Sequence, residues 1–174
     1  MTVPAQTSAA RHAAGKAEPT QYLTFTSGGE TFAIGILCVK EIIEYAGVTD
    51  VPMMSECIRG VINLRGSVVT VMDLAARFGR PRAAITKRSC VIIVELEEAP
   101  GEQQVVGVVV DAVNAVLDID PADIEPPPSF GARYRAEFIE GMGKVNGKFV
   151  ILLDPAQVFS FDEIALLQAQ QAAE

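Results

Sequence analysis

The chain has 174 residues, of which 49% are hydrophobic, and its formal net charge is −8 at pH 7. This length can bury one moderate core or two small ones. The acidic balance argues against binding to nucleic acid or to an anionic membrane surface, because both depend on Lys and Arg side chains. No apolar run approaches the roughly 18 uncharged residues of a membrane span, so we expect no direct membrane insertion.

Residues 1–20 are rich in Ala, Thr and Pro and lack the apolar centre of a secretory signal. We expect them to form a disordered N-terminal tail. The three cysteines, Cys38, Cys57 and Cys90, are widely spaced and form no C-x-x-C pair. This spacing predicts neither a disulfide framework nor a zinc site, and it favours a cytoplasmic protein.

Short β-branched runs separated by turn residues follow the tail and predict a mostly antiparallel, all-β fold. The expected strands are YLTFTS, TFAIGIL, GVINL, SVVTVMD, CVIIVEL, QVVGVVVDAV, IEGMGKV and KFVILLD. Helix signals are few: DLAARFG and DPAQVFS each begin with an N-capping Asp. SFDEIALLQAQQA opens with a Ser160-to-Glu163 capping box and predicts a C-terminal helix.

The expected strands contain an internal repeat. Residues 58–78 align without gaps on residues 139–159, so that Gly60, Gly66 and Asp73 fall on Gly141, Gly147 and Asp154. A weaker match places the segment from Phe32 on the segment from Val106. Two similar sets of short strands predict two small barrels, because closure removes exposed sheet edges. The seam between the barrels would form a groove.

The repeat places Arg65-Gly66 opposite Asn146-Gly147. Asn-Gly between two strands is a strong signal for a tight hairpin turn, so we expect the same turn at Arg65. Arg adopts the positive φ of such a turn less readily than Asn does. Arg65 is either an ordinary solvated turn residue or a charged group presented for recognition. The turn sequence leaves both interpretations open.

Catalytic signals are missing from the expected folded region. The single histidine, His12, lies in the tail, and neither a P-loop nor a dinucleotide-binding glycine motif is present. We therefore expect no enzyme activity, no metal and no cofactor. Asp73 and Asp154 each stand where a strand meets a helix, and N-capping explains them better than a carboxylate-based catalytic site. Such a site is the remote alternative.

The connector from Asp118 to Gly141 is rich in Pro and acidic residues and lacks strand periodicity. Long irregular loops in compact domains are often functional. Phe130 follows three consecutive prolines closely, so it is either an aromatic contact for a protein partner or a lid on the second barrel.

From about Gln21 to Leu167, the sequence resembles the CheW family of bacterial chemotaxis coupling proteins. The blocks that carry the resemblance are QYLTF, ETFAIGILCVKEIIEY, IRGVINLRGSVVTVMDL, VVGVVVDAVNAVL, IEPPPSF and FIEGMGKVNGKFVILLD, and GVINLRG is the most specific. The resemblance implies two intertwined five-stranded SH3-like barrels with a groove between them. The expected division is a tail over 1–20, a CheW-like domain over 21–168, and a C-terminal helix and tail over 160–174. Within the domain, modules 21–86 and 87–160 would share strands.

The resemblance also implies a function: a non-catalytic adaptor that joins the cytoplasmic tips of chemoreceptors (methyl-accepting chemotaxis proteins) to the regulatory domain of the histidine kinase CheA. Such a protein would be cytoplasmic and recruited to membrane-associated receptor arrays, where other copies of itself in rings are a further candidate partner. A related chemosensory pathway, for surface motility or gene regulation, is the alternative. The implied receptor-binding groove contains Val39, Glu41, Gly60, Arg65, Gly66 and Cys90. Phe130 is the implied kinase contact.

Overall fold

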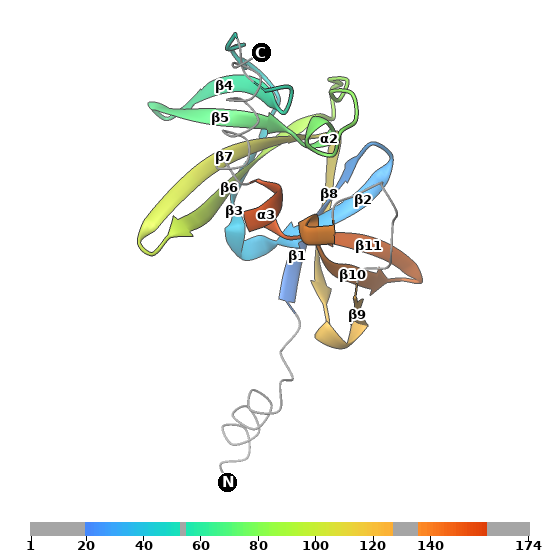
Figure 1. Cartoon of the computed structure of the whole chain (residues 1–174). Coiled ribbons are helices and arrows are strands. Elements are labelled where there is room, and N and C mark those ends of the chain that lie inside the picture. Colours follow the sequence, from blue (N-terminus) through green and yellow to red (C-terminus); the bar gives the residue numbers. More distant parts are fainter. Residues whose placement is uncertain (1–19, 53–54, 127–135, 160–174) are drawn as a thin grey trace.

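The computed structural model describes residues 20–52, 55–126 and 136–159, which form two β-sheets (Figure 1). The five-stranded sheet has the order β3-β6-β7-β5-β4, and the six-stranded sheet has the order β8-β1-β2-β11-β10-β9. The strands of the first sheet are β3 (Val39–Glu44), β4 (Ile58–Leu64), β5 (Ser67–Asp73), β6 (Cys90–Ala99) and β7 (Glu102–Val110). Those of the second are β1 (Thr20–Ser27), β2 (Glu30–Gly35), β8 (Ala112–Ile119), β9 (Ile124–Glu125), β10 (Ile139–Val145) and β11 (Lys148–Leu153).

Short helical elements connect these strands. The α-helices are α2 (Leu74–Arg77) and α3 (Pro155–Val158), and the 3₁₀ turns are η1 (Ile36–Cys38), η2 (Pro121–Asp123) and η3 (Ala136–Phe138). No helix in the described ranges has the length and apolar character needed to cross a membrane. The all-β prediction is confirmed, with one addition: the two-residue strand β9 gives the second sheet a sixth strand. The expected helix over 160–174 and residues 1–19 lie outside the described residues, and Thr20 is already the first residue of β1.

The two sheets exchange strands. The chain leaves the six-stranded sheet after β2, passes through η1 and enters the five-stranded sheet at β3; it returns between β7 and β8. As a result, β1 and β2 pair with strands from the later part of the chain, and β6 and β7 complete the earlier sheet. Each sheet therefore contains strands from both expected modules, residues 21–86 and residues 87–160.

The internal repeat is visible in the hairpins β4–β5 and β10–β11. Both contain an irregularity before the aligned glycine, between Ile58 and Gly60 and between Ile139 and Gly141. The weaker match of the repeat also corresponds to equivalent strand pairs. In one pair β5 lies parallel to β7, with Thr70 opposite Val106. In the other β11 lies parallel to β2, with Ile151 opposite Phe32. Both parts of the repeat therefore describe equivalent strands of two similar modules.

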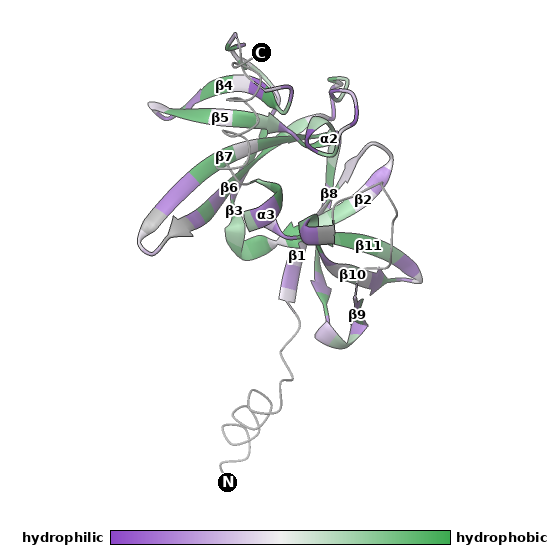
Figure 2. Cartoon of the chain, viewed as in Figure 1, coloured by the Kyte–Doolittle hydropathy of each residue, from purple (hydrophilic) through white to green (hydrophobic). Residues whose placement is uncertain are grey.

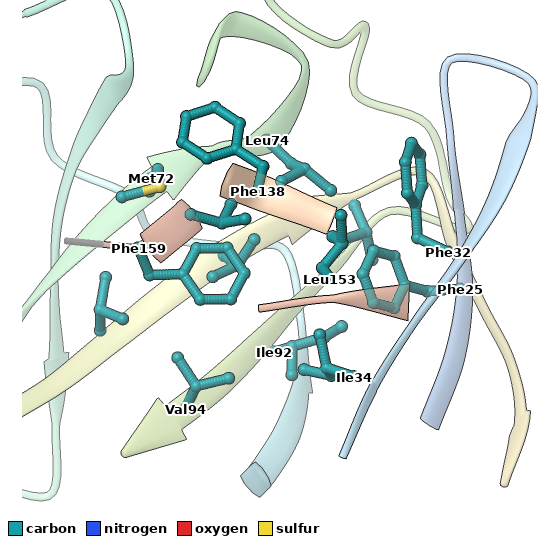
Figure 3. Close-up of a cluster of buried hydrophobic side chains, with 14 of the residues drawn as sticks. Phe25, Phe32, Ile34, Met72, Leu74, Ile92, Val94, Phe138, Leu153 and Phe159 are labelled. Atoms are coloured by element: carbon teal, nitrogen blue, oxygen red, sulfur yellow. The ribbon is translucent and has the colours of Figure 1, made fainter. Parts of the chain in front are cut away.

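Buried hydrophobic residues form three clusters. The largest joins the two sheets and includes Phe25, Phe32, Phe138 and Phe159, all at most 1% exposed (Figure 3). Ile62, Val71 and Ile93 belong to the cluster of the five-stranded sheet, and a smaller cluster fills the six-stranded sheet. Figure 2 shows the hydrophobic residues along β3, β5 and β7, with hydrophilic residues near the β6–β7 turn. The shared cluster fixes the two sheets against each other.

Candidate protein-interaction site

The structure brings together two of the predicted site residues, Glu41 of β3 and Arg65 of the β4–β5 turn. Two guanidinium nitrogens of Arg65 donate to the two carboxylate oxygens of Glu41, and the Nη2–Oε1 distance is 3.0 Å. The Arg65 side chain is 72% exposed, whereas that of Glu41 is 23% exposed. A bidentate pair of this kind fixes the plane of the guanidinium, so Arg65 is held in one orientation at the surface.

The backbone at Arg65 adopts the predicted tight turn. Arg65 has φ 52° and Gly66 has φ 88°, and the equivalent residues Asn146 and Gly147 have φ 50° and 78°. The side chain of Asn63 accepts a hydrogen bond from the Gly66 amide at 2.9 Å, which stabilises the turn. Two successive positive φ values are the geometry of a two-residue hairpin loop. The hairpin prediction is therefore confirmed in both copies of the repeat.

The ion pair changes the titration of both partners. The hydrogen bonds from Arg65 lower the pKa of Glu41, and the charges of Arg65 and Lys40 act in the same direction. Glu41 in turn raises the pKa of Arg65. A carboxyl group with a lowered pKa is ionised at neutral pH, so both members of the pair carry their charges under physiological conditions.

A cavity of about 480 Å³ lies next to this ion pair. It lies between the β4–β5 hairpin and β7, and its lining includes Lys40, Leu64, Arg65, Val68 and Gln104. Val68 is 73% exposed, so an apolar side chain stands at the surface beside the charged one. Lys40 forms an ion pair with Glu95 across the neighbouring strands at 3.4 Å. The cavity and the ion pair together offer a surface with apolar and charged groups side by side.

Gly60 allows the segment after β3 to pack closely against β4, which closes the five-stranded sheet. Its φ is 149°, and a Cβ atom placed there would lie 2.0 Å from the backbone oxygen of Thr49. Thr49 and Val61 exchange two backbone hydrogen bonds of 2.9 Å, which tie the segment after β3 to β4. Together with the Glu41–Arg65 pair, this bridge joins the two edge strands of the sheet. Gly60 is therefore a backbone position that allows this closure.

Val39 lies on β3, the strand of Glu41, and Cys90 lies on β6, the strand that pairs with β3. Val39 begins β3, pairs with Val94 and packs against the shared hydrophobic cluster. Cys90 begins β6 opposite Glu44 and also packs against that cluster, while its thiol donates to the backbone oxygen of Arg88 at 3.4 Å. Cys90 is three residues along β6 from Ile93, the partner of Glu41, which is roughly 10 Å at strand spacing. The predicted site residues therefore extend along one sheet.

Two exposed apolar residues, close in the sequence to Val39 and Glu41, were not predicted. Leu37, in η1, is 96% exposed, and Ile42, in β3, is 41% exposed. The signal for Ile42 was present, because β3 alternates between half-buried and exposed positions and Ile42 falls on an exposed one. Leu37 carries no such signal, since its exposure depends on the change of sheet between β2 and β3. Phe130, the expected kinase contact, lies outside the described residues.

Comparison with known proteins decides the family. The family model for the CheW-like domain matches residues 21–163. The chain belongs to the CheW-like domain family. It is 34% identical to the chemotaxis protein CheW of Klebsiella aerogenes over 154 residues, covering 88% of this chain and 90% of that protein. It is 31% identical to the chemotaxis protein CheW of Rhizobium meliloti over 143 residues, which cover 82% and 89% of the two chains.

The fold of this CheW-like chain also matches a solved structure. The crystal structure of the scaffolding protein TtCheW from Thermoanaerobacter tengcongensis superimposes with a TM-score of 0.72 at 34% sequence identity. The match covers 83% of this chain and 90% of that one. The CheW-like domain includes both hairpins of the repeat and the Glu41–Arg65 pair, so the site described above lies within the part of the chain that defines the family.

Proposed function

We propose that this CheW-like chain is a non-catalytic chemotaxis adaptor that couples the cytoplasmic tips of chemoreceptors to the histidine kinase CheA. The proposal rests on the family match over residues 21–163, together with the relatives named as chemotaxis proteins. The adaptor acts in the cytoplasm and is recruited to membrane-associated receptor arrays. An adaptor needs binding surfaces and no reacting groups, so the exposed Arg65 and its neighbours are the features to test.

The receptor-binding surface in this proposal contains Val39, Glu41, Arg65 and Gly66. Glu41 holds the guanidinium of Arg65 through two of its five N–H donors, so the others remain able to donate to a receptor helix. Fixing the side chain before binding lowers the entropy lost in the complex. Val39 supplies apolar surface, while Gly60 and Cys90 keep the sheet in the shape that presents these groups.

The test uses receptor signalling tips in membranes and a CheA-type kinase in a co-sedimentation assay. Arg65→Asn removes the charge but installs the residue that occupies the equivalent turn at position 146, so the hairpin is kept. We expect kinase recruitment to fall at least about tenfold, which corresponds to the loss of charge-assisted contacts. A melting temperature within about 3 °C of the parent serves as the folding control.

A second variant separates recognition from structure. Glu41→Arg combined with Arg65→Glu restores an ion pair between the two positions but reverses the charge offered at the turn. Recruitment that stays low in this exchange variant supports direct recognition by Arg65. Full recruitment by either Arg65→Asn or the exchange variant would show that Arg65 does not bind the receptor.

The kinase contact in this proposal includes Phe130. Phe130→Ala should weaken binding to the isolated CheA regulatory domain while leaving binding to receptor tips unchanged, because the two surfaces use different residues. If the folded parent protein binds neither the receptor tips nor the kinase, that result would instead favour a related chemosensory pathway, for surface motility or gene regulation.

A further inference from the structure

A second groove lies on the seam between the two sheets and shares no lining residue with the cavity beside Arg65. Its volume is about 1050 Å³. One wall is the loop between α2 and β6, and the other contains the β1–β2 turn and the junction of β7 with β8. In Figure 1 this loop and the β1–β2 hairpin lie on the same side of the molecule. The groove is thus formed by both modules.

The loop that lines this groove has an unusual charge. Between Asp73 and Glu95 the sequence contains five cationic residues and no acidic one, although the whole chain carries a net charge of −8. The cations are Arg77, Arg80, Arg82, Lys87 and Arg88. A concentrated positive region in an acidic protein raises the local concentration of anionic ligands, and its effect does not depend on the net charge alone.

Three of these cations have structural partners. Arg77 is buried and donates to the backbone oxygen of Val158 at 2.7 Å. Arg80 lies 3.6 Å from a carboxylate oxygen of Glu30. Arg82 donates to the backbone oxygens of residues 56 and 58 at 3.2 and 2.7 Å. These contacts attach the loop to the rest of the molecule.

Lys87 and Arg88 differ from the other three. Both are exposed and line the groove, and within the ranges that the structure describes neither side chain has an ion pair or a hydrogen bond. They occupy the centre of a turn in which the Ser89 amide donates to the Thr86 backbone oxygen at 3.1 Å. The hydroxyl groups of Thr86 and Ser89 accept further backbone N–H bonds at 3.1 and 2.8 Å. The turn therefore holds the two cations at the groove without using their charged groups.

The opposite wall adds one negative charge to the lining, against three positive charges on the loop, from Arg80, Lys87 and Arg88. Asp111 lines the groove, and one of its carboxylate oxygens accepts a hydrogen bond from the Gly28 amide at 2.9 Å. Small residues form much of the remaining lining, and these are Gly28, Ala75, Ala83, Ala84 and Ala112. Small side chains permit the close approach of another backbone. Next to them in the loop, Ile85 is 40% exposed and offers an apolar contact.

We propose that this groove binds an acidic, extended segment of a partner protein, with carboxylates on Lys87 and Arg88. The volume is above the range of about 300–1,000 Å³ that is typical of small-molecule sites, and it suits several residues of a peptide. Nucleic acid is disfavoured because the other surfaces of an acidic chain repel a long phosphate backbone. The proposal goes beyond coupling through Arg65 and uses none of the same residues.

The test measures fluorescence anisotropy of a labelled 12-residue peptide of alternating Glu and Ala with the full-length protein. We expect saturable binding that weakens at least about tenfold in Lys87→Glu/Arg88→Glu, and that weakens when salt is raised from about 50 to about 500 mM. The matched control is Lys144→Glu/Lys148→Glu, which makes the same change in charge at exposed positions of the β10–β11 hairpin. This control should bind the peptide within about twofold of the parent.

Three results would overturn the proposal. The first is that the parent protein binds the Glu peptide no more tightly than it binds a peptide in which Gln replaces Glu. The second is an equal loss in both double variants, since net charge alone would then explain the binding. The third is tighter binding of a single-stranded DNA oligonucleotide of similar charge, which would identify a nucleic-acid site instead.

Discussion

Arg65 and Asn146 have nearly the same backbone conformation, with φ of 52° and 50°, in equivalent turns of the two modules. The difference lies in the side chain. Arg65 reaches Glu41 on the other edge strand of its sheet, whereas Asn is too short and uncharged for such a pair. A long charged residue is tolerated at positive φ because Gly66 takes the second strained position and the ion pair adds a favourable contact.

The Glu41–Arg65 pair should make the stability of the fold depend on pH. Because Arg65 lowers the pKa of Glu41 in the folded state, the pair contributes stability above the ordinary Glu pKa of 4.5 and loses that contribution as the pH falls through the lowered value. In Arg65→Asn the Glu41 pKa should return toward 4.5, measured by NMR titration of its side-chain carboxyl carbon. An identical Glu41 pKa in parent and variant would contradict the ion pair in solution.

The close approach of Thr49 to Gly60 should make the fold sensitive to a side chain at position 60. Gly60→Ala adds a methyl group at a positive φ, 2.0 Å from the Thr49 oxygen, and it should lower the free energy of unfolding by about 3 kcal/mol. Urea denaturation measures the change. Gly35→Ala is the matched control, because nothing lies within 4 Å of the added methyl group and its φ is negative. A loss below about 1 kcal/mol at Gly60 would show that closure at Thr49 does not need glycine.

At the scale of elements, each repeated hairpin ends in an aspartate that caps a short helix. Asp73 accepts a hydrogen bond from the Ala76 amide, and Asp154 accepts one from the Ala156 amide, both at 3.1 Å. The N-cap predictions are therefore confirmed. Asp73 has further contacts in addition to its cap. It is fully buried, its carboxylate accepts a hydrogen bond from the Ala83 amide, and one of its oxygens lies 3.4 Å from the guanidinium of Arg59.

This difference predicts unequal costs for the same substitution. Asp154→Ala should lower the free energy of unfolding by about 1 kcal/mol, the usual cost of a lost cap. Asp73→Ala should cost about 3 kcal/mol, because it also leaves Arg59 and the Ala83 amide without their buried partner. Chemical denaturation of the two variants side by side provides the comparison. Equal costs would mean that Asp73 acts as a cap alone.

At the scale of the whole molecule, the sheets depend on each other in two ways. Each contains strands from both parts of the chain, and the largest hydrophobic cluster lies between them. Arg77 of α2 adds a direct link, since it donates to backbone oxygens of Gln157 and Val158 in α3 and lies over the ring of Phe138 at 4.6 Å. The two modules should therefore fold as one cooperative unit.

Neither module should fold when it is separated from the other. Residues 21–86 alone lack β6 and β7, and residues 87–160 alone lack β1 and β2, so each fragment loses two adjacent strands of a sheet. We expect neither fragment to show a cooperative thermal transition by circular dichroism, whereas the intact chain shows a single one. A cooperative transition in either separate fragment would contradict the mutual dependence of the modules.

Features that depend on local patterns and on the repeat could be predicted from the amino-acid sequence. Alternation predicted the strands, the alignment of Arg65-Gly66 on Asn146-Gly147 predicted both turns, and the position of Asp73 predicted its cap. These signals are readable because strand periodicity, turn geometry and capping involve residues close in the chain. The motif GVINLRG and its neighbours also indicated the family, and the family match confirmed it.

Contacts between residues distant in the sequence could not be predicted, because they depend on how the strands pair and how the sheets fold. Glu41 and Arg65 pair because the five-stranded sheet curls until its two edge strands, β3 and β4, come together. Gly60 is required because the backbone of Thr49 pairs closely with β4 at that point. The exchange of β6 and β7 into the earlier sheet places Lys87 and Arg88 on a groove that both modules form. Strand periodicity gives the face of each residue but not the partner strand, so these contacts follow from the pairing of the sheets alone.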